Sequence, residues 1–313
     1  MKTYIHIGYP KTASTTLQKD IFPAIKNTKY LGKYYKPLKK FLSDDITESL
    51  KAIVSQDSIS FNQKCVERKL KNGIEEVRGN NEKVILSFED FAQNVVDRGV
   101  VAERLFGIFP DAKILIIIRN QIDTLQSMYT FMLMHLGKNI NLSYGGPSVQ
   151  TFERWITEQE SFMSRSFIST LNYYEFITKY WQLFGREKVT VLFFEDLVSS
   201  PDLFFDKMAD YFDVDEIDMN SNKSVPKRNK GASSKELFSY RIRKGLFPHQ
   251  SFSKYLSLFM TKVWRRYLEK DVGSVRHELS QDTQARLQDY FREGNRRLQE
   301  ELNVDLAEYK FIL

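Results

Sequence analysis

The sequence predicts an α/β fold in which helices flank a central parallel sheet and a helical part follows at the C-terminal end. Four short runs are almost continuously apolar, as expected for strands covered on both faces: residues 3–8, 83–88, 112–119 and 188–195. Segments of helical character follow or separate them: residues 15–25, 91–109, 122–136 and 173–184. Alternation of strand and helix is typical of parallel sheets, whose ligands bind beyond the carboxyl ends of the strands.

The single elements support this assignment. The purest apolar run, ILIII at 114–118, is far shorter than the ~20 residues that cross a bilayer and ends at Arg119, so it is a buried strand. Pro201 stands where a helix begins, ahead of an apolar stripe. Near the end of the chain, Leu298, Leu302 and Leu306 have helical spacing.

Length and composition predict one folded domain of 313 residues. A rule of ~150 residues per domain would give two, but α/β folds of this size often form one unit. We expect an α/β core over 1–214, a polar loop that covers the ligand over 215–235, and a helical part over 236–313. The 42% hydrophobic content excludes a disordered chain.

Cysteine usage predicts a reducing compartment. Cys65 is the one cysteine, so no internal disulfide can form, and no cysteine spacing for structural zinc exists. The N-terminal residues contain no apolar stretch typical of a signal peptide. We therefore expect a cytoplasmic protein.

Positive charge is concentrated in two segments. Residues 1–40 contain nine Lys against one Asp, and residues 227–270 contain twelve Lys and Arg against two Glu, whereas the net charge of the whole chain is only +6. If the fold brings both segments together they form one anion-binding surface. The alternative is two ordinary solvated faces.

The segment from Gly8 to Thr16, GYPKTASTT, is the most informative. It follows the first strand and opens a helix, an arrangement that directs unpaired backbone N–H groups toward a bound anion. Lys11 and four hydroxyl side chains lie within it. A plain turn with a Ser/Thr-capped helix is the alternative.

This segment differs from a Walker A loop, which has a second glycine directly before its lysine. It resembles the 5′-phosphosulfate loop of sulfotransferases that use 3′-phosphoadenosine 5′-phosphosulfate (PAPS). The resemblance implies a P-loop-like fold related to the nucleotide kinases and a donor site that contains Pro10, Lys11, Thr12, Ala13, Ser14, Thr15 and Thr16. Ala13 replaces the glycine usual in this family, at little cost only if its φ is negative.

Two further segments match the family. Arg119 ends a strand and Ser127 follows eight residues later in the next helix, the pair that in these enzymes binds the 3′-phosphate of PAPS. Arg228, Lys230 and Gly231 fit, more loosely, the loop that closes over the nucleotide.

Glu89, after the strand 83–88, is the candidate general base, since the family places a glutamate or histidine there. The alternative interpretation is that Glu89 or Asp90 caps the helix expected from Phe91 onward. Glu195 and Asp196 form a similar acidic pair at the end of the strand 188–195 and are expected to be structural. No metal site is expected.

The resemblance implies transfer of a sulfuryl group from PAPS to a hydroxyl or amine of an acceptor, predicted to be a saccharide. Two alternatives stay open at this stage. One is an ATP- and Mg²⁺-dependent kinase. The other is a non-catalytic binder of polyanions or anionic membrane surfaces through the basic, aromatic stretch 251–270. No nucleic-acid motif accompanies the lysines, so no nucleic-acid partner is expected. The sequence leaves the oligomeric state and the acceptor's identity open.

Overall fold

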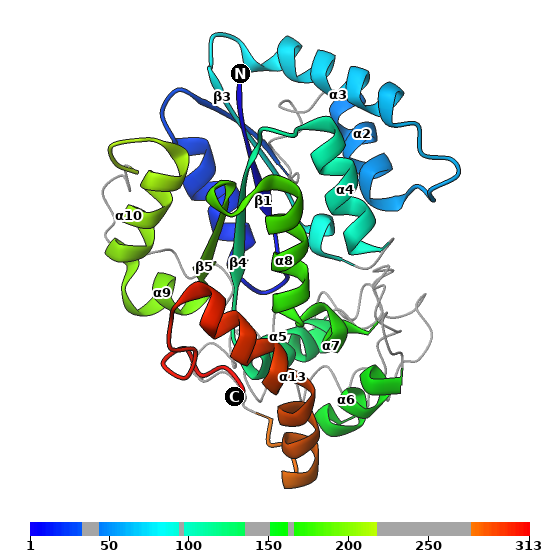
Figure 1. Cartoon of the computed structure of the whole chain (residues 1–313), viewed down its shortest axis with the longest axis vertical. Coiled ribbons are helices and arrows are strands. Elements are labelled where there is room, and N and C mark those ends of the chain that lie inside the picture. The colour runs from blue at the N-terminus through cyan, green and yellow to red at the C-terminus, as the bar shows by residue number, and fades with distance from the viewer. Residues whose placement is uncertain (33–43, 94–96, 135–150, 162–165, 218–276) are drawn as a thin grey trace, which may run out of the picture. The chain divides into compact units, whose positions relative to one another are not determined.

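A five-stranded parallel sheet lies at the centre of the computed structural model, with strand order β2-β3-β1-β4-β5 (Figure 1). The structure describes residues 1–32, 44–93, 97–134, 151–161, 166–217 and 277–313. The strands are β1 (Lys2–Ile7), β2 (Thr28–Gly32), β3 (Lys83–Phe88), β4 (Lys113–Ile118) and β5 (Val189–Phe193). The predicted fold is confirmed. All four predicted strands are present, and β2 is an additional one.

The chain divides into two compact units. The first unit comprises Met1–Asn120, Thr170–Pro226 and Phe291–Leu313, and the second comprises Gln121–Ser169 and Lys227–Tyr290. Both units also include residues outside the described ranges. The whole sheet belongs to the first unit.

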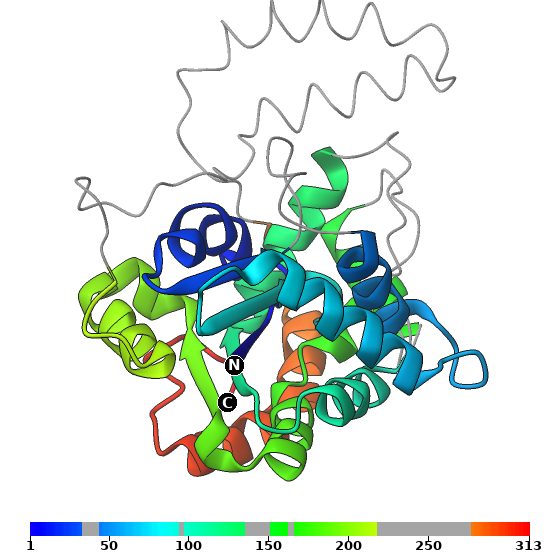
Figure 2. The same cartoon turned by 90° about the horizontal axis from the view of Figure 1, so that it is seen from above.

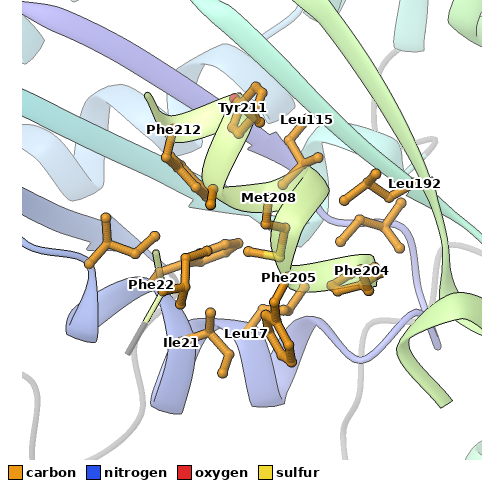
Figure 3. Packing of buried hydrophobic residues seen from close by; sticks show 14 of the residues in the cluster. Leu17, Ile21, Phe22, Leu115, Leu192, Phe204, Phe205, Met208, Tyr211 and Phe212 are labelled. Carbon is orange, nitrogen blue, oxygen red and sulfur yellow. The ribbon is translucent and has the colours of Figure 1, made fainter. Parts of the chain in front are cut away.

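One face of the sheet packs against the segment that follows the first loop and against two later helices. Tyr4, Ile85 and Leu115 point to this face. The covering elements are η1 (Leu17–Ile21, π-helical), η2 (Phe22–Ala24), α9 (Phe194–Ser199) and α10 (Pro201–Phe212). Figure 3 shows Leu17 and Phe22 of the first group against Phe204, Met208 and Phe212 of the second. This apolar contact fixes the start of the chain, loop included, on the sheet.

The opposite face carries the alternate residues of the same strands, among them Ile5, Ile7, Ile114 and Ile116, all buried. Helices α4 (Arg98–Ile108) and α8 (Tyr173–Phe184) lie on this side, and α2 (Asp44–Ser55) and α3 (Gln63–Arg78) pack with α4. Figure 2 shows the strands between the two groups of helices of this unit. Burial on both faces explains why the strands are almost continuously apolar.

The second unit contains α5 (Gln121–Met134), α6 (Phe152–Ser161), most of the short α7 (Phe167–Thr170) and the start of α13 (Gln281–Leu302). An aromatic cluster forms its core. The Tyr129 ring lies 5.2 Å from the Phe152 ring and 4.9 Å from that of His277. Trp155 stacks on Phe152 at 6.0 Å.

Three predicted helices have different bounds. The helix expected over 91–109 begins only at Arg98, where the Asp97 carboxylate accepts from the N–H of Gly99 at 2.7 Å. The helix expected over 15–25 divides into α1 (Ser14–Thr16), η1 and η2. The last helix ends at Leu302, before Leu306, because Asn303 takes a φ of 52°.

Helix α10 begins at Pro201, and α8 has its predicted bounds. Most of the expected covering loop, 218–235, and residues 236–276 lie outside the described residues. Within the described part of the chain, no helix has the length and apolar character needed to span a membrane.

Candidate active site at the carboxyl edge of the sheet

Gly8 brings the end of β1 against the end of β3. A Cβ atom at Gly8 would lie 3.1 Å from both Cα and Cγ of Glu89, tighter than most real Cβ contacts, so Glu89 would have to shift by a few tenths of an ångström. Glycine is therefore required here because the segment at Glu89 approaches closely, and not because of the backbone conformation at residue 8. As a result the first loop and Glu89 lie side by side.

The loop after Gly8 contains two non-glycine residues with positive φ, Lys11 at 68° and Ala13 at 62°. Left-handed residues inside a loop turn successive N–H groups to one side and form a concave anion site. The Thr12 hydroxyl donates to the Tyr9 carbonyl at 2.8 Å, and the Ser14 hydroxyl does so at 3.2 Å. These two hydroxyls thus brace the loop itself.

Alanine at position 13 does not meet the condition set by the sequence analysis. Its φ is positive, so the Cβ atom crowds the backbone and the conformation costs roughly 1–2 kcal/mol, a cost that glycine avoids. The loop therefore keeps its shape although it lacks the family's glycine. Contacts around the loop must offset the strain.

Lys11 is the electrostatic centre of the site. Burial and, to a smaller extent, the neighbouring positive charge of Arg119 lower the pKa of Lys11 from 10.5 to about 8, while Glu89 opposes the shift. At neutral pH the side chain still carries its proton. A half-buried cation beside a second cation is stabilised further by an anionic ligand, which adds negative charge to that of Glu89.

Arg119 lies beside the loop, directly after β4. Its Nη1 donates to the Lys11 carbonyl at 3.1 Å, and its guanidinium lies 4.4 Å from the centre of the Phe194 ring. The next residue, Asn120, donates to Glu195 Oε1 through its backbone N–H at 2.9 Å and its side chain at 2.8 Å. Glu195 thus holds the chain where it leaves β4.

Glu89 opens the short helix η4 (Glu89–Ala92), at the carboxyl end of β3. It cannot cap the helix once expected from residue 91, because α4 starts later and Asp97 caps it. Behind Glu89, the Ser87 hydroxyl lies 2.8 Å from His6 Nδ1 and accepts from Gln18 Nε2 at 3.0 Å. Burial lowers the pKa of His6 to about 3, so this histidine stays neutral.

The remaining predicted residues divide into three groups. Pro10 and Thr16 are buried and Thr15 is half-buried, all in the first loop and helix. Ser127 is half-buried in α5 of the second unit, and its part in the site stays a prediction. Arg228, Lys230 and Gly231 lie outside the described residues.

Two tyrosines that the sequence analysis did not single out hold the site from behind. The buried Tyr9 hydroxyl accepts from Arg98 Nη1 at 3.0 Å, and burial raises the pKa of Tyr9 to about 12. The Tyr173 hydroxyl donates to the Arg119 carbonyl at 2.7 Å. The only sequence signal is aromatic content, and with 16 tyrosines it does not identify either one.

Lys11, Glu89 and Arg119 thus meet at the carboxyl ends of β1, β3 and β4 in one unit. A parallel α/β sheet with an anion-binding loop after its first strand defines a nucleotide-binding protein of the P-loop-like class. Among the described residues, no group of three or more His, Cys, Asp or Glu could hold a metal ion.

The sequence profile of the sulfotransferase domain family matches residues 4–295, and the chain belongs to this family. A sulfotransferase structure from Alicyclobacillus acidocaldarius aligns with 99% of each chain at 14% identity and a TM-score of 0.56, and has the same fold. A mouse sulfotransferase complexed with PAP aligns with 86% of this chain and 88% of its own at 15% identity, TM-score 0.40. No curated protein sequence matches.

Proposed function

We propose that this sulfotransferase moves the sulfuryl group of PAPS to a hydroxyl or amine of a saccharide acceptor. Lys11 and the backbone N–H groups of the loop residues 11–15 bind the 5′-phosphosulfate, and Arg119 with Ser127 binds the 3′-phosphate. Arg228, Lys230 and Gly231 cover the nucleotide, and Glu89 is the general base. Members of this family use PAPS as donor, and the chain's membership supports the proposal.

The observation that carries the proposal is the meeting of two cations and one carboxylate at the loop. Lys11 and Arg119 interact with each other, and Glu89 interacts with Lys11. Two half-buried positive charges side by side are unfavourable alone and favourable around a ligand with two separate anionic groups. PAPS has such groups at its 5′ and 3′ positions.

In the proposed reaction the acceptor oxygen or nitrogen attacks sulfur in line with the departing phosphate oxygen. One bond forms from sulfur to the acceptor, and the bond from sulfur to the 5′-phosphate oxygen breaks. The acceptor's proton passes to Glu89, and adenosine 3′,5′-bisphosphate (PAP) leaves. Lys11 and the loop N–H groups stabilise the negative charge that grows on this leaving phosphate.

The proposed location of the acceptor is beside Glu89, at the contact between Gly8 and η4. A glutamate base and the basic segments favour a saccharide, in particular an acidic one.

We further propose a cytoplasmic location and a single functional domain. The location is based on the one cysteine, Cys65, which is half-buried and has a free thiol. A contact of the basic stretch 251–270 with anionic membranes is a further prediction, on residues outside the described ranges.

The first experiment compares donors. The purified protein is incubated with a panel of oligosaccharides and either PAPS with EDTA or ATP with Mg²⁺, and products are identified by mass spectrometry. We expect sulfated product with PAPS in the presence of EDTA and no phosphorylated product with ATP. Phosphorylation that needs Mg²⁺ would support the kinase alternative instead. Lipids and small molecules with hydroxyl groups are incubated in parallel, and sulfation of these alone would overturn the saccharide assignment.

The second experiment tests Glu89. Glu89→Gln keeps the size of the side chain and removes the base, so kcat should fall by ~100-fold or more while PAP still binds. Glu82→Gln is the matched control, because Glu82 is exposed just before the other end of β3. Equal kcat for both variants would exclude Glu89 as base. The double variant Glu89→Gln with Ser127→Ala separates sulfotransfer from simple binding of polyanions. Sulfotransfer needs both side chains, because Ser127 is assigned to donor binding, whereas polyanion binding should need neither.

A further inference from the structure

The Arg119 backbone is held at the point where the chain leaves β4. The Tyr173 hydroxyl, on the first residue of α8, donates to the Arg119 carbonyl at 2.7 Å. Tyr173 is 1% exposed and Arg119 is half-buried, so this bond is partly shielded from solvent. It ties the strand end to a helix that packs on the sheet.

Other contacts complete the restraint of this segment. Asn120, the next residue, is held by Glu195, and the Arg119 guanidinium donates to the Lys11 carbonyl at 3.1 Å. The carbonyl and the N–H of the 119–120 peptide are therefore both hydrogen-bonded. With that peptide plane fixed, the arginine side chain leaves the strand in one direction.

Tyr173 also touches the first loop. Its ring meets the Tyr9 ring edge to face with centroids 5.1 Å apart. The ring of Phe311, near the C-terminus of the chain, lies 6.1 Å away on another side. One side chain therefore packs on the loop proposed for the 5′-phosphosulfate while its hydroxyl holds the arginine proposed for the 3′-phosphate.

We infer that Tyr173 is a positioning residue that sets the direction of the Arg119 guanidinium and thereby the preference for a donor with a 3′-phosphate. The inference rests on the proposed function, because it takes Arg119 to bind that phosphate. A guanidinium binds phosphate through a planar fork of donors, so its orientation decides how many hydrogen bonds form. Without the hydroxyl of Tyr173 the peptide after Arg119 is held from one side only.

The test is Tyr173→Phe, which keeps the ring packing and removes the hydroxyl. Calorimetry measures the Kd of PAP and of adenosine 5′-phosphate, which differ by the 3′-phosphate. The wild type should bind PAP more tightly. In Tyr173→Phe we expect that preference to fall by about three- to tenfold, as for loss of one buried hydrogen bond, with little change in the Kd of adenosine 5′-phosphate.

Tyr180→Phe is the matched control. It lies on the same helix, is fully buried, and its hydroxyl has no hydrogen-bond partner within the described residues. This variant should keep the wild-type preference. Arg119→Ala supplies the reference without the guanidinium, and adding Tyr173→Phe to it should cause no further loss of preference.

The outcomes separate the two proposals. If the wild type binds both nucleotides equally, the assignment of a 3′-phosphate site fails. If the wild type prefers PAP and Tyr173→Phe weakens both nucleotides by the same factor, the tyrosine is merely structural and the positioning inference alone is wrong. Thermal unfolding of each variant identifies any that fails to fold, and Tyr173→Trp, which also lacks the hydroxyl, then repeats the comparison.

Discussion

Lysines lie at both the amino ends and the carboxyl ends of the strands, here called the amino edge and the carboxyl edge of the sheet, and the surroundings of these lysines differ. At the amino edge, Lys113 donates to the Asp213 carboxylate at 2.7 Å and Lys83 donates to the Asp213 carbonyl at 2.7 Å. The Tyr4 hydroxyl donates to the same carboxylate at 2.9 Å. At the carboxyl edge, Lys11 lies beside Arg119, and burial lowers its pKa.

This difference separates charge with a structural role from charge proposed to bind the donor. At the amino edge the lysines are neutralised by a carboxylate and carbonyls that tie three strands to α10. At the carboxyl edge Lys11 and Arg119 lie close enough to interact unfavourably, and Glu89 offsets only part of the shift in the pKa of Lys11, an arrangement that suits the proposed anionic donor. A count of charges along residues 1–40 gives Lys2 and Lys11 equal weight, although only one belongs to the site.

The largest expected effect comes from Lys11→Ala. The substitution removes the preorganised positive charge that stabilises the leaving phosphate, so kcat should fall by ~100- to 1000-fold while the fold stays intact. Lys113→Ala, at the other edge of the same sheet, should keep kcat within about twofold. Sulfotransfer assays and circular dichroism on both variants check this. Near wild-type transfer by Lys11→Ala would falsify the assignment.

The second prediction concerns pH. Since burial brings the pKa of Lys11 to about 8, kcat/KM for PAPS should fall about tenfold per pH unit above pH 8. The same shift means that the buried charge costs stability below pH 8, and that this cost disappears as the pH rises toward 10.5. A rate profile flat to pH 10 would contradict the electrostatic account of the site.

The third prediction tests the amino edge. Asp213→Asn removes the charge that pairs with Lys113, and we expect a loss of about 1 kcal/mol in the free energy of unfolding at pH 7 with no change in the Kd of PAP. The Lys113 hydrogen bond lowers the pKa of Asp213, so its contribution is present above about pH 4 and lost in more acidic solution. Urea unfolding at pH 7 and pH 3 measures both; a weaker Kd for PAP would contradict the separation of the two edges.

The smallest effect is expected for Ala13→Gly. Both edges contain a non-glycine residue in the left-handed region, Ala13 at φ 62° and Asp213 at φ 52°. Only at Ala13 does glycine relieve strain without removing an ion pair, and the gain should be about 0.5 kcal/mol after the extra freedom of the unfolded chain is subtracted. Thermal unfolding measures it, and a lower Tm for Ala13→Gly would show that the loop is not strained.

Most of the sheet was predictable, because strands buried on both faces are apolar runs that stand out in any sequence. Strand β2, TKYLG, was not, since it is an edge strand with two polar residues in five. The amphipathic helices α2 and α3 also escaped prediction. The early start predicted for α4 failed because the apolar residue Phe91 belongs to η4 and the N-terminal cap is Asp97.

The candidate site was predictable only where chemistry is local in sequence. The loop from Gly8 to Thr16 and the strand-end residues Glu89 and Arg119 have charged or small side chains at informative places. Tyr173 and Glu195 act through single hydrogen bonds to the backbone at 119 and 120, and no periodicity reports such contacts. The positive φ of Ala13 is likewise a property of the fold, invisible in the residue type.

The way the first loop is supported has a consequence for how the protein matures. The loop occupies residues 8–16, but the groups that hold it come from Glu89, Arg98, Arg119 and Tyr173, much later in the chain. A nascent chain thus exposes the complete loop sequence long before the anion site can exist. If the proposed site is correct, nucleotide binding reports completed folding, and excess PAP should protect the finished chain from proteases by mass action.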